Sequence, residues 1–353
     1  MRKNIFSLLA CLAVLAAMSS CARKAVDKSL PRGEASEELN AAFEGYLAAV
    51  EESGLDVHSI MIVQHGKVLE EAWRSEGHPD SLHILNSVSK TFTATAVGFA
   101  VSEGLLSVED TVISFFPDEL PDYVSENLAK MQVKHLLTMT GGHDTDPTGT
   151  VLRGSEPVDN WAEYFLAYPV EHEPGTYFVY NSVGTYMLSA IVQKVTGEKV
   201  LDYLTPRLFE PLGIEGATWS ESPQGINAGG WGLYLKTEDL AKMGQFLLQK
   251  GSWNGKQLLP AEWVEEATSK KTESLPAGMK PEDITPDYQR SDWVQGYCYQ
   301  MWRCRHGAVR ADGANGQYIL LLPEQDAVVA MTAHLNDMQA ELNQVWDYIL
   351  PAL

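Results

Sequence analysis

The chain has 353 residues, of which 45% are hydrophobic and 21% are charged, and its formal net charge is −21. This composition is typical of a globular protein with at least one large core, and it excludes a mainly disordered chain. Because the charge is strongly negative, nucleic acid and anionic lipid surfaces are poor partners. We therefore expect no nucleic-acid binding.

The first twenty residues have the pattern of an export signal. Arg2 and Lys3 form a basic start, an apolar run follows in IFSLLACLAVLAAM, and small residues end it. Cys21 comes directly after them, as in the lipobox of bacterial lipoproteins, so the pattern predicts a lipoprotein signal peptide over residues 1–20 and lipidation of Cys21. The alternative is an ordinary cleavage site followed by a chance cysteine. We expect an envelope protein, periplasmic or on the outer surface, that meets the membrane only through this anchor.

Three elements are predicted in the first part of the mature chain. Residues 21–38 are polar and aperiodic, which favours a tether to a single domain over residues 39–353. Apolar spacing predicts a helix from Leu39 to Ser53, and two β-rich runs around His65-Gly66-Lys67 predict an antiparallel hairpin.

The middle of the chain is predicted to be helical, and strands return near its end. Helical periodicity covers residues 91–103, 134–139, 183–196, 201–208 and 239–249. Strands are predicted in VQGYCYQMWRC, GQYILLLP and DAVVAMTAH, and a last amphipathic helix in DMQAELNQVWDYIL. Strands from both chain ends most economically form one antiparallel sheet, so we expect an α/β sandwich with a helical subdomain beside it.

Two cysteines remain in the predicted domain, Cys298 and Cys304. Both fall in the first of the late predicted strands, where six extended residues span about 20 Å, too far for a disulfide between them. We predict two free, mostly buried thiols. Their spacing does not suit a zinc cluster, and we expect no metal and no cofactor.

Ser87 and Lys90 lie three residues apart at the start of a predicted helix, in SVSKTFTATAVGFA. This spacing brings the lysine amine close to the serine hydroxyl. A lysine can activate a serine only if burial lowers the lysine pKa, and the nearly uncharged neighbours suit a buried lysine. The alternative is a serine that only caps the helix.

Five segments occur in the order of a known hydrolase family. They are SVSKTFTATAVGFAVSEGLLSVEDTV, VKHLLTMTGG, PGTYFVYNSVGTYMLSAIVQKVTG, GGWGLYLKTEDLAKMGQFLLQKG and ADGANGQYILLLPEQDAVVAMTA. Together they resemble the serine β-lactamase and penicillin-binding-protein-like hydrolases over about residues 40–350, and most closely the class-C-like branch of esterases and amidases that includes the aminohexanoate-dimer hydrolases. The resemblance implies a β-lactamase-like fold with Ser87 as nucleophile, Lys90 as its base partner and Tyr180 as the tyrosine facing the serine.

Other positions of these segments suggest substrate contacts. The resemblance places the backbone N–H groups of Ser87 and Ala314 as an oxyanion hole, and Gly313 would allow close backbone approach. Ser182 stands where the family has asparagine, and it can hydrogen-bond Lys90 or a substrate carbonyl. Trp231 either walls the acyl pocket or packs in the core or a lid.

The segment Ala311-Asp312-Gly313 departs from the family pattern of Lys or His, any residue, then Gly. An alanine cannot attract a carboxylate and Asp312 would repel one, so β-lactams and D-Ala-D-Ala peptides are disfavoured unless a nearby arginine compensates. The candidates for that compensation are Arg303, Arg305 and Arg310.

The sequence therefore predicts a serine hydrolase that cleaves a small-molecule ester, amide or short peptide through a Ser87 acyl-enzyme, with Lys90 and Tyr180 as base and acid. One alternative is a catalytically silent module that binds an envelope ligand, and another is a D-peptidase or β-lactamase with a relocated cation. His143 and His172 lie beside carboxylates but lack the spacing of a zinc hydrolase, so we predict solvated loop residues.

Overall fold

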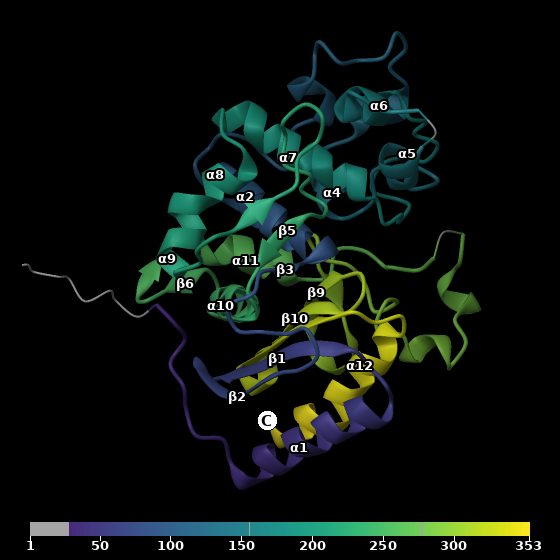
Figure 1. The fold of residues 1–353 in the computed structure, drawn as a ribbon. Coiled ribbons are helices and arrows are strands. Elements are labelled where there is room, and N and C mark those ends of the chain that lie inside the picture. Colours follow the sequence, from purple (N-terminus) through teal and green to yellow (C-terminus); the bar gives the residue numbers. More distant parts are fainter. Residues whose placement is uncertain (1–27, 155, 277) are drawn as a thin grey trace, which may run out of the picture.

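The computed structural model describes residues 28–353 except residues 155 and 277. Its centre is one antiparallel sheet in the order β2-β1-β11-β10-β9-β8, so strands from both ends of the chain pair as predicted (Figure 1). The strands are β1 (Val57–Gln64), β2 (Lys67–Trp73), β8 (Trp302–Arg303), β9 (Val309–Gly313), β10 (Gln317–Leu322) and β11 (Ala327–Ala333).

Helices cover both faces of this sheet because its strands are apolar on both sides. The terminal helices α1 (Glu37–Glu52) and α12 (Met338–Gln344) pack on one face, and α10 (Thr237–Leu248) packs on the other (Figure 1). Successive residues of a strand point to opposite faces. Accordingly, Ile60 and Ile62 join the cluster under α1, whereas Met61 and Val63 join the larger cluster on the far side.

The middle of the chain forms the helical subdomain, as predicted. At its centre α2 (Ser89–Ser102) packs against α7 (Ser182–Thr196), and these two helices are buried along most of their length. Around them lie α3 (Glu126–Lys130), α4 (Val133–Leu137), α5 (Thr148–Arg153), α6 (Trp161–Ala167), α8 (Val200–Leu204), α9 (Glu210–Leu212) and α11 (Ala261–Thr268). The short strands are β3 (His83–Ile84), β4 (Thr218–Trp219), β5 (Leu233–Leu235), β6 (Ser252–Trp253) and β7 (Lys256–Gln257). In the part of the chain that the structure describes, no helix is long and apolar enough to cross a membrane.

The segment predicted as a tether packs on the domain from Leu30 onward. Leu30 is 4% exposed, and the Val68 backbone exchanges hydrogen bonds with Pro31 and Gly33. Arg32 pairs with carboxylates on β2 and α10. The tether prediction is therefore wrong for this stretch, because a single leucine and an arginine with two acidic partners suffice to dock it. The predicted signal peptide, Cys21 and the rest of the tether lie outside the described residues.

The prediction of one continuous strand through Cys298 and Cys304 is also wrong. Only Trp302–Arg303 is a strand, because Gln300 adopts a left-handed backbone with φ of 60° and the Cys298 N–H bonds back to Met301. Both cysteines are nevertheless free and buried, as predicted, and burial raises the pKa of the Cys298 thiol to about 12.

Candidate active site

Ser87 lies in a 3₁₀ turn, Asn86–Val88, between β3 and α2. Asn86 has a left-handed backbone, with φ of 47°, which asparagine tolerates better than most residues. Its side chain donates a 2.7 Å hydrogen bond to the Ala314 carbonyl, which ties the serine turn to the loop after β9. We did not single out Asn86 in the sequence, although an asparagine directly before the nucleophile was a usable signal.

Gly313 and Ala314 meet the serine turn as the resemblance implied. A Cβ on Gly313 would lie 2.3 Å from the Leu85 carbonyl oxygen, so only glycine lets the two backbones approach this closely. Ala314 is exposed, and Ser87 is partly exposed beside it. The two segments that would supply the oxyanion-hole N–H groups are thus in contact.

Lys90 is 1% exposed and its Nζ contacts three oxygen atoms. They are Ser87 Oγ at 3.0 Å, Ser182 Oγ at 2.9 Å and the Gly230 carbonyl at 2.8 Å. Burial lowers the Lys90 pKa to about 7, although the negative charges of Asp146 and Asp312 oppose this shift. A large share of Lys90 is therefore neutral near pH 7, when its lone pair can accept the Ser87 proton.

Tyr180 lies beside both Ser87 and Lys90. Its ring stacks on Trp302, with centroids 5.3 Å apart, and Lys90 Nζ is 4.7 Å from the centroid of the Tyr180 ring. Burial raises the pKa of the Tyr180 phenol above its usual range, and a hydrogen bond with Ser87 lowers it less strongly. Tyr180 therefore stays protonated near neutral pH and can donate a proton, whereas Lys90 is the group able to accept one. Trp302, which orients the tyrosine, was not predicted from the sequence.

Ser182 contacts Lys90, whereas the neighbouring Asn181 does not. The Ser182 hydroxyl accepts a hydrogen bond from Lys90, while the Asn181 side chain turns away and caps α7 by accepting the Gly184 N–H at 2.9 Å. Serine in place of the usual asparagine thus keeps a hydrogen bond to the lysine.

None of the three arginines considered as a carboxylate clamp presents a free guanidinium to Ser87. Arg310 is fully buried and pairs with Asp312 at 2.7 Å. Arg305 pairs with Asp292 at 2.9 Å, and Arg303 donates to backbone carbonyls. Arg305 and Arg310 are therefore each paired with a carboxylate of the fold, although one guanidinium nitrogen of Arg310, Nη2, is buried without a hydrogen-bond partner among the described residues.

Trp231 follows Gly230 in the tight GGWG passage, where a Cβ on Gly230 would lie 2.7 Å from the Ser182 carbonyl. The Trp231 ring packs against Trp161, with centroids 5.5 Å apart, so it contacts the helical subdomain, and its role toward substrate stays a prediction.

The two histidines near carboxylates have different surroundings. The prediction of a solvated loop is wrong for His143, which is 2% exposed against Phe165 and whose pKa burial lowers to about 4. His172 is partly exposed, pairs with Asp144 at 3.1 Å and stacks on Tyr177. Across residues 28–353, apart from the two positions not described, no cluster of potential metal ligands is found.

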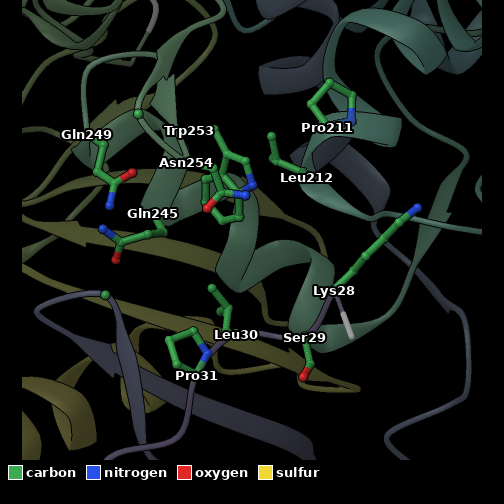
Figure 2. Close-up of a pocket in the computed structure, with 12 residues that line it drawn as sticks. Lys28, Ser29, Leu30, Pro31, Pro211, Leu212, Gln245, Gln249, Trp253 and Asn254 are labelled. Atoms are coloured by element: carbon green, nitrogen blue, oxygen red, sulfur yellow. The ribbon is translucent and has the colours of Figure 1, made fainter. Parts of the chain in front are cut away.

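Two cavities can be compared by whether Ser87, Lys90 or Tyr180 lines them. A cavity of about 440 Å³ lies between the docked N-terminal segment, α9 and the β6–β7 hairpin, and its lining includes Leu30, Leu212 and Trp253 (Figure 2). Neither Ser87, Lys90 nor Tyr180 lines it, so its size does not make it the reaction site. A smaller cavity of about 250 Å³ is lined by Tyr180 and Trp302.

The site thus has a serine hydroxyl hydrogen-bonded to a buried lysine, with a tyrosine beside it. This is the kind of arrangement that a serine hydrolase requires. Residues 40–353 match the family described as Beta-lactamase, and the chain belongs to this family, whose members include serine hydrolases.

Similar proteins agree with this assignment. The chain is 27% identical to the 6-aminohexanoate-dimer hydrolase of Paenarthrobacter ureafaciens over 288 residues, which are 77% of this chain and 71% of that protein. Among solved structures, a putative 6-aminohexanoate-dimer hydrolase from Bacillus anthracis superposes with a TM-score of 0.70 at 18% identity, covering 92% of this chain and 87% of the other. EstCE1, a hydrolase with promiscuous acyltransferase activity, superposes with a TM-score of 0.69 at 17% identity, covering 89% and 98%. At these identities the two structures show a common fold.

Proposed function

We propose that this protein hydrolyses uncharged esters or amides through an acyl-enzyme on Ser87. The observation that carries the proposal is the 3.0 Å contact between Ser87 Oγ and a buried lysine whose pKa is about 7. The name of the relative from Paenarthrobacter ureafaciens, 6-aminohexanoate-dimer hydrolase, agrees with hydrolysis as the reaction, while the preference for uncharged substrates rests on the charges described below.

In the proposed acylation, neutral Lys90 takes the proton of Ser87 as Oγ attacks the substrate carbonyl. The N–H groups of Ser87 and Ala314 stabilise the oxyanion. Tyr180 then gives its proton to the departing oxygen or nitrogen and regains one from the Lys90 ammonium, so the alcohol or amine leaves neutral. In deacylation, water gives a proton to the same pair and attacks the acyl carbonyl, and Ser87 recovers its hydroxyl.

The charges around the site favour a neutral substrate over a β-lactam. Ala311 stands where related enzymes carry a cation, and the next residue, Asp312, is paired with Arg310, which is buried beneath the aromatic side chains of Trp293 and Trp302. A substrate carboxylate placed here would meet the Asp312 carboxylate, and both Arg305 and Arg310 are already paired with carboxylates of the fold.

Steady-state kinetics with three substrates tests the proposal: a neutral ester such as phenyl acetate, a neutral anilide, and a chromogenic cephalosporin. We expect turnover of the ester or the anilide, and a loss of at least about a thousandfold in Ser87→Ala. Ser102→Ala, at the far end of the same helix, is the matched control and should retain activity. Hydrolysis of only the cephalosporin would favour the β-lactamase alternative, and ester turnover that survives in Ser87→Ala would exclude the acyl-enzyme.

We also propose that the protein is held at the cell envelope by a lipid on Cys21. The support is the pattern of residues 1–21, with its basic start, apolar run and cysteine after small residues. Mass spectrometry of the N-terminal peptide from membrane fractions should find diacylglyceryl-modified Cys21. An unmodified peptide, or a chain that still begins at Met1, would contradict the proposed lipid anchor and envelope localisation.

A further inference from the structure

The cavity beside Tyr180 has the walls of a pocket for an apolar group. Its volume is about 250 Å³, and aromatic and aliphatic side chains dominate its lining, which includes Phe178, Leu275, Tyr288, Trp293 and Trp302. None of the described residues that line it is charged. Apolar pockets with few polar groups bind apolar ligand parts, because a charged group would lose its hydration there without compensation.

The aromatic walls hold one another in place. Trp302 stacks on Tyr180 and meets Tyr297 at right angles, with centroids 4.9 Å apart, and Phe178 contacts the edge of Trp302 at 5.8 Å. The Ser274 hydroxyl, a polar group of the lining, already donates to the Trp293 carbonyl at 2.8 Å and accepts the Gly296 N–H. The pocket is therefore built before substrate arrives.

The position of Tyr180 indicates which half of a substrate enters this cavity. The group that protonates a leaving atom must lie within hydrogen-bond reach of it, so the leaving group is on the Tyr180 side of Ser87. The oxyanion, by contrast, points to the Ser87 and Ala314 amides. Tyr180 is both the proton donor of the proposed reaction and a wall of the cavity.

On the basis of the proposed function, we propose that this cavity binds the leaving group, and that the enzyme prefers esters and amides whose alcohol or amine part is an uncharged aromatic or bulky apolar group. The size agrees, since a cavity of about 150 Å³ lined by apolar side chains suffices for benzene. A volume of about 250 Å³ therefore holds a phenyl ring with a short linker.

Two isomeric esters separate the leaving-group side from the acyl side. 2-Phenylethyl acetate carries its ring on the alcohol, whereas methyl 3-phenylpropanoate carries it on the acyl group. Both esters release an unactivated alcohol, 2-phenylethanol and methanol respectively, so the leaving groups have similar intrinsic reactivity. We expect kcat/KM for 2-phenylethyl acetate to exceed that for its isomer by about tenfold or more, since smaller differences in a hydrophobic pocket already give such ratios. Equal values, or faster cleavage of methyl 3-phenylpropanoate, would overturn the assignment while leaving the hydrolase function intact.

Two variants test whether the preference for an apolar leaving group arises in this cavity. Leu275→Trp fills the pocket and Tyr288→Ala removes one wall, so each should lower the ratio of kcat/KM for 2-phenylethyl acetate to that for ethyl acetate by about tenfold. Tyr123→Ala is the matched control, because Tyr123 is 77% exposed and lines a different surface region, and it should leave the ratio unchanged. An unchanged ratio in both folded pocket variants would contradict the proposal.

A binding measurement keeps this test independent of catalysis. In Ser87→Ala, saturation-transfer NMR should detect 2-phenylethanol bound to the protein, and the added Leu275→Trp substitution should abolish the signal. If no ester is cleaved but this binding is found, the proposed function fails and the apolar pocket stands. If esters are cleaved but 2-phenylethanol does not bind, the pocket assignment fails alone.

Discussion

The pKa of Lys90 should set the pH dependence of activity, and Asp146 is one of its determinants. Burial brings this pKa from 10.5 down to about 7, while the charge of Asp146 acts in the opposite direction. A lysine is a base only when neutral, so kcat/KM should rise with pH along an acid limb centred near pH 7. About a tenth of Lys90 is neutral at pH 6 and about nine tenths at pH 8.

The substitution Asp146→Asn removes a negative charge that stabilises the Lys90 cation. The amide keeps the oxygen that accepts hydrogen bonds from the Thr148 N–H and hydroxyl, so the local turn should be retained. The Lys90 pKa should fall further and the acid limb should move to lower pH. A shift of about half a pH unit, reasonable for a solvent-screened charge, raises activity at pH 6 about threefold relative to the plateau.

The assay is kcat/KM for a neutral ester between pH 5 and 9, at constant ionic strength, for the wild type and Asp146→Asn. Asp122→Asn, at an exposed position, is the matched control and should leave the limb in place. The pH difference between the wild-type and Asp146→Asn limbs should also be smaller at high salt, because salt screens the Asp146 charge in the wild type. A limb that moves to higher pH in Asp146→Asn, or a profile that is flat through pH 7, would refute the assignment of Lys90 as the base.

Three further predictions concern other positions. Tyr180→Phe keeps the ring that stacks on Trp302 but removes the proton donor, so kcat should fall about 10²- to 10⁴-fold with little change in melting temperature. Gly313→Ala should cost activity and about 1–3 kcal/mol of stability, because its Cβ would lie 2.3 Å from the Leu85 carbonyl. Gly149→Ala, which has open space inside helix α5, should instead stabilise by up to about 1 kcal/mol in the same denaturant titration. Glu341 is buried without a hydrogen-bond partner for its carboxyl oxygens among the described residues, and burial raises its pKa well above 4.5. The folded chain therefore holds this proton more tightly than the unfolded chain, and stability falls as pH rises above about 4.5. Glu341→Gln should raise the melting temperature at pH 8 and lose that advantage near pH 4.5; equal gains at both pH values would contradict the carboxyl as the cause.

Much of the fold was predictable because local patterns and long-range pairing agree in this chain. The β1–β2 hairpin, the buried helices α2 and α7, and the return of strands β10 and β11 all have clear periodicity. Ser87 and Lys90 were predictable for the same reason, since their contact is made within one helical turn.

The errors occur where tertiary contacts override local pattern. Residues 294–304 are rich in aromatic side chains and suggest a long strand. The left-handed Gln300 instead turns the chain, and its side chain donates hydrogen bonds to carbonyls of α4. Leu30 docks although its neighbours are polar, and His143 is buried by helices distant in the sequence. Asn86 and Trp302 contribute through partners that single-sequence patterns do not reveal.

The most direct test of the central claim is covalent labelling of Ser87. The purified protein is treated with a fluorophosphonate that reacts with activated serines, and intact mass and peptide mapping are then recorded for the wild type, Lys90→Ala and Tyr180→Phe. The account predicts one adduct, on Ser87, that is lost in Lys90→Ala and strongly slowed in Tyr180→Phe. A folded wild-type protein in which Ser87 stays unlabelled would contradict it and favour a ligand-binding module in which Ser87 has only a structural role.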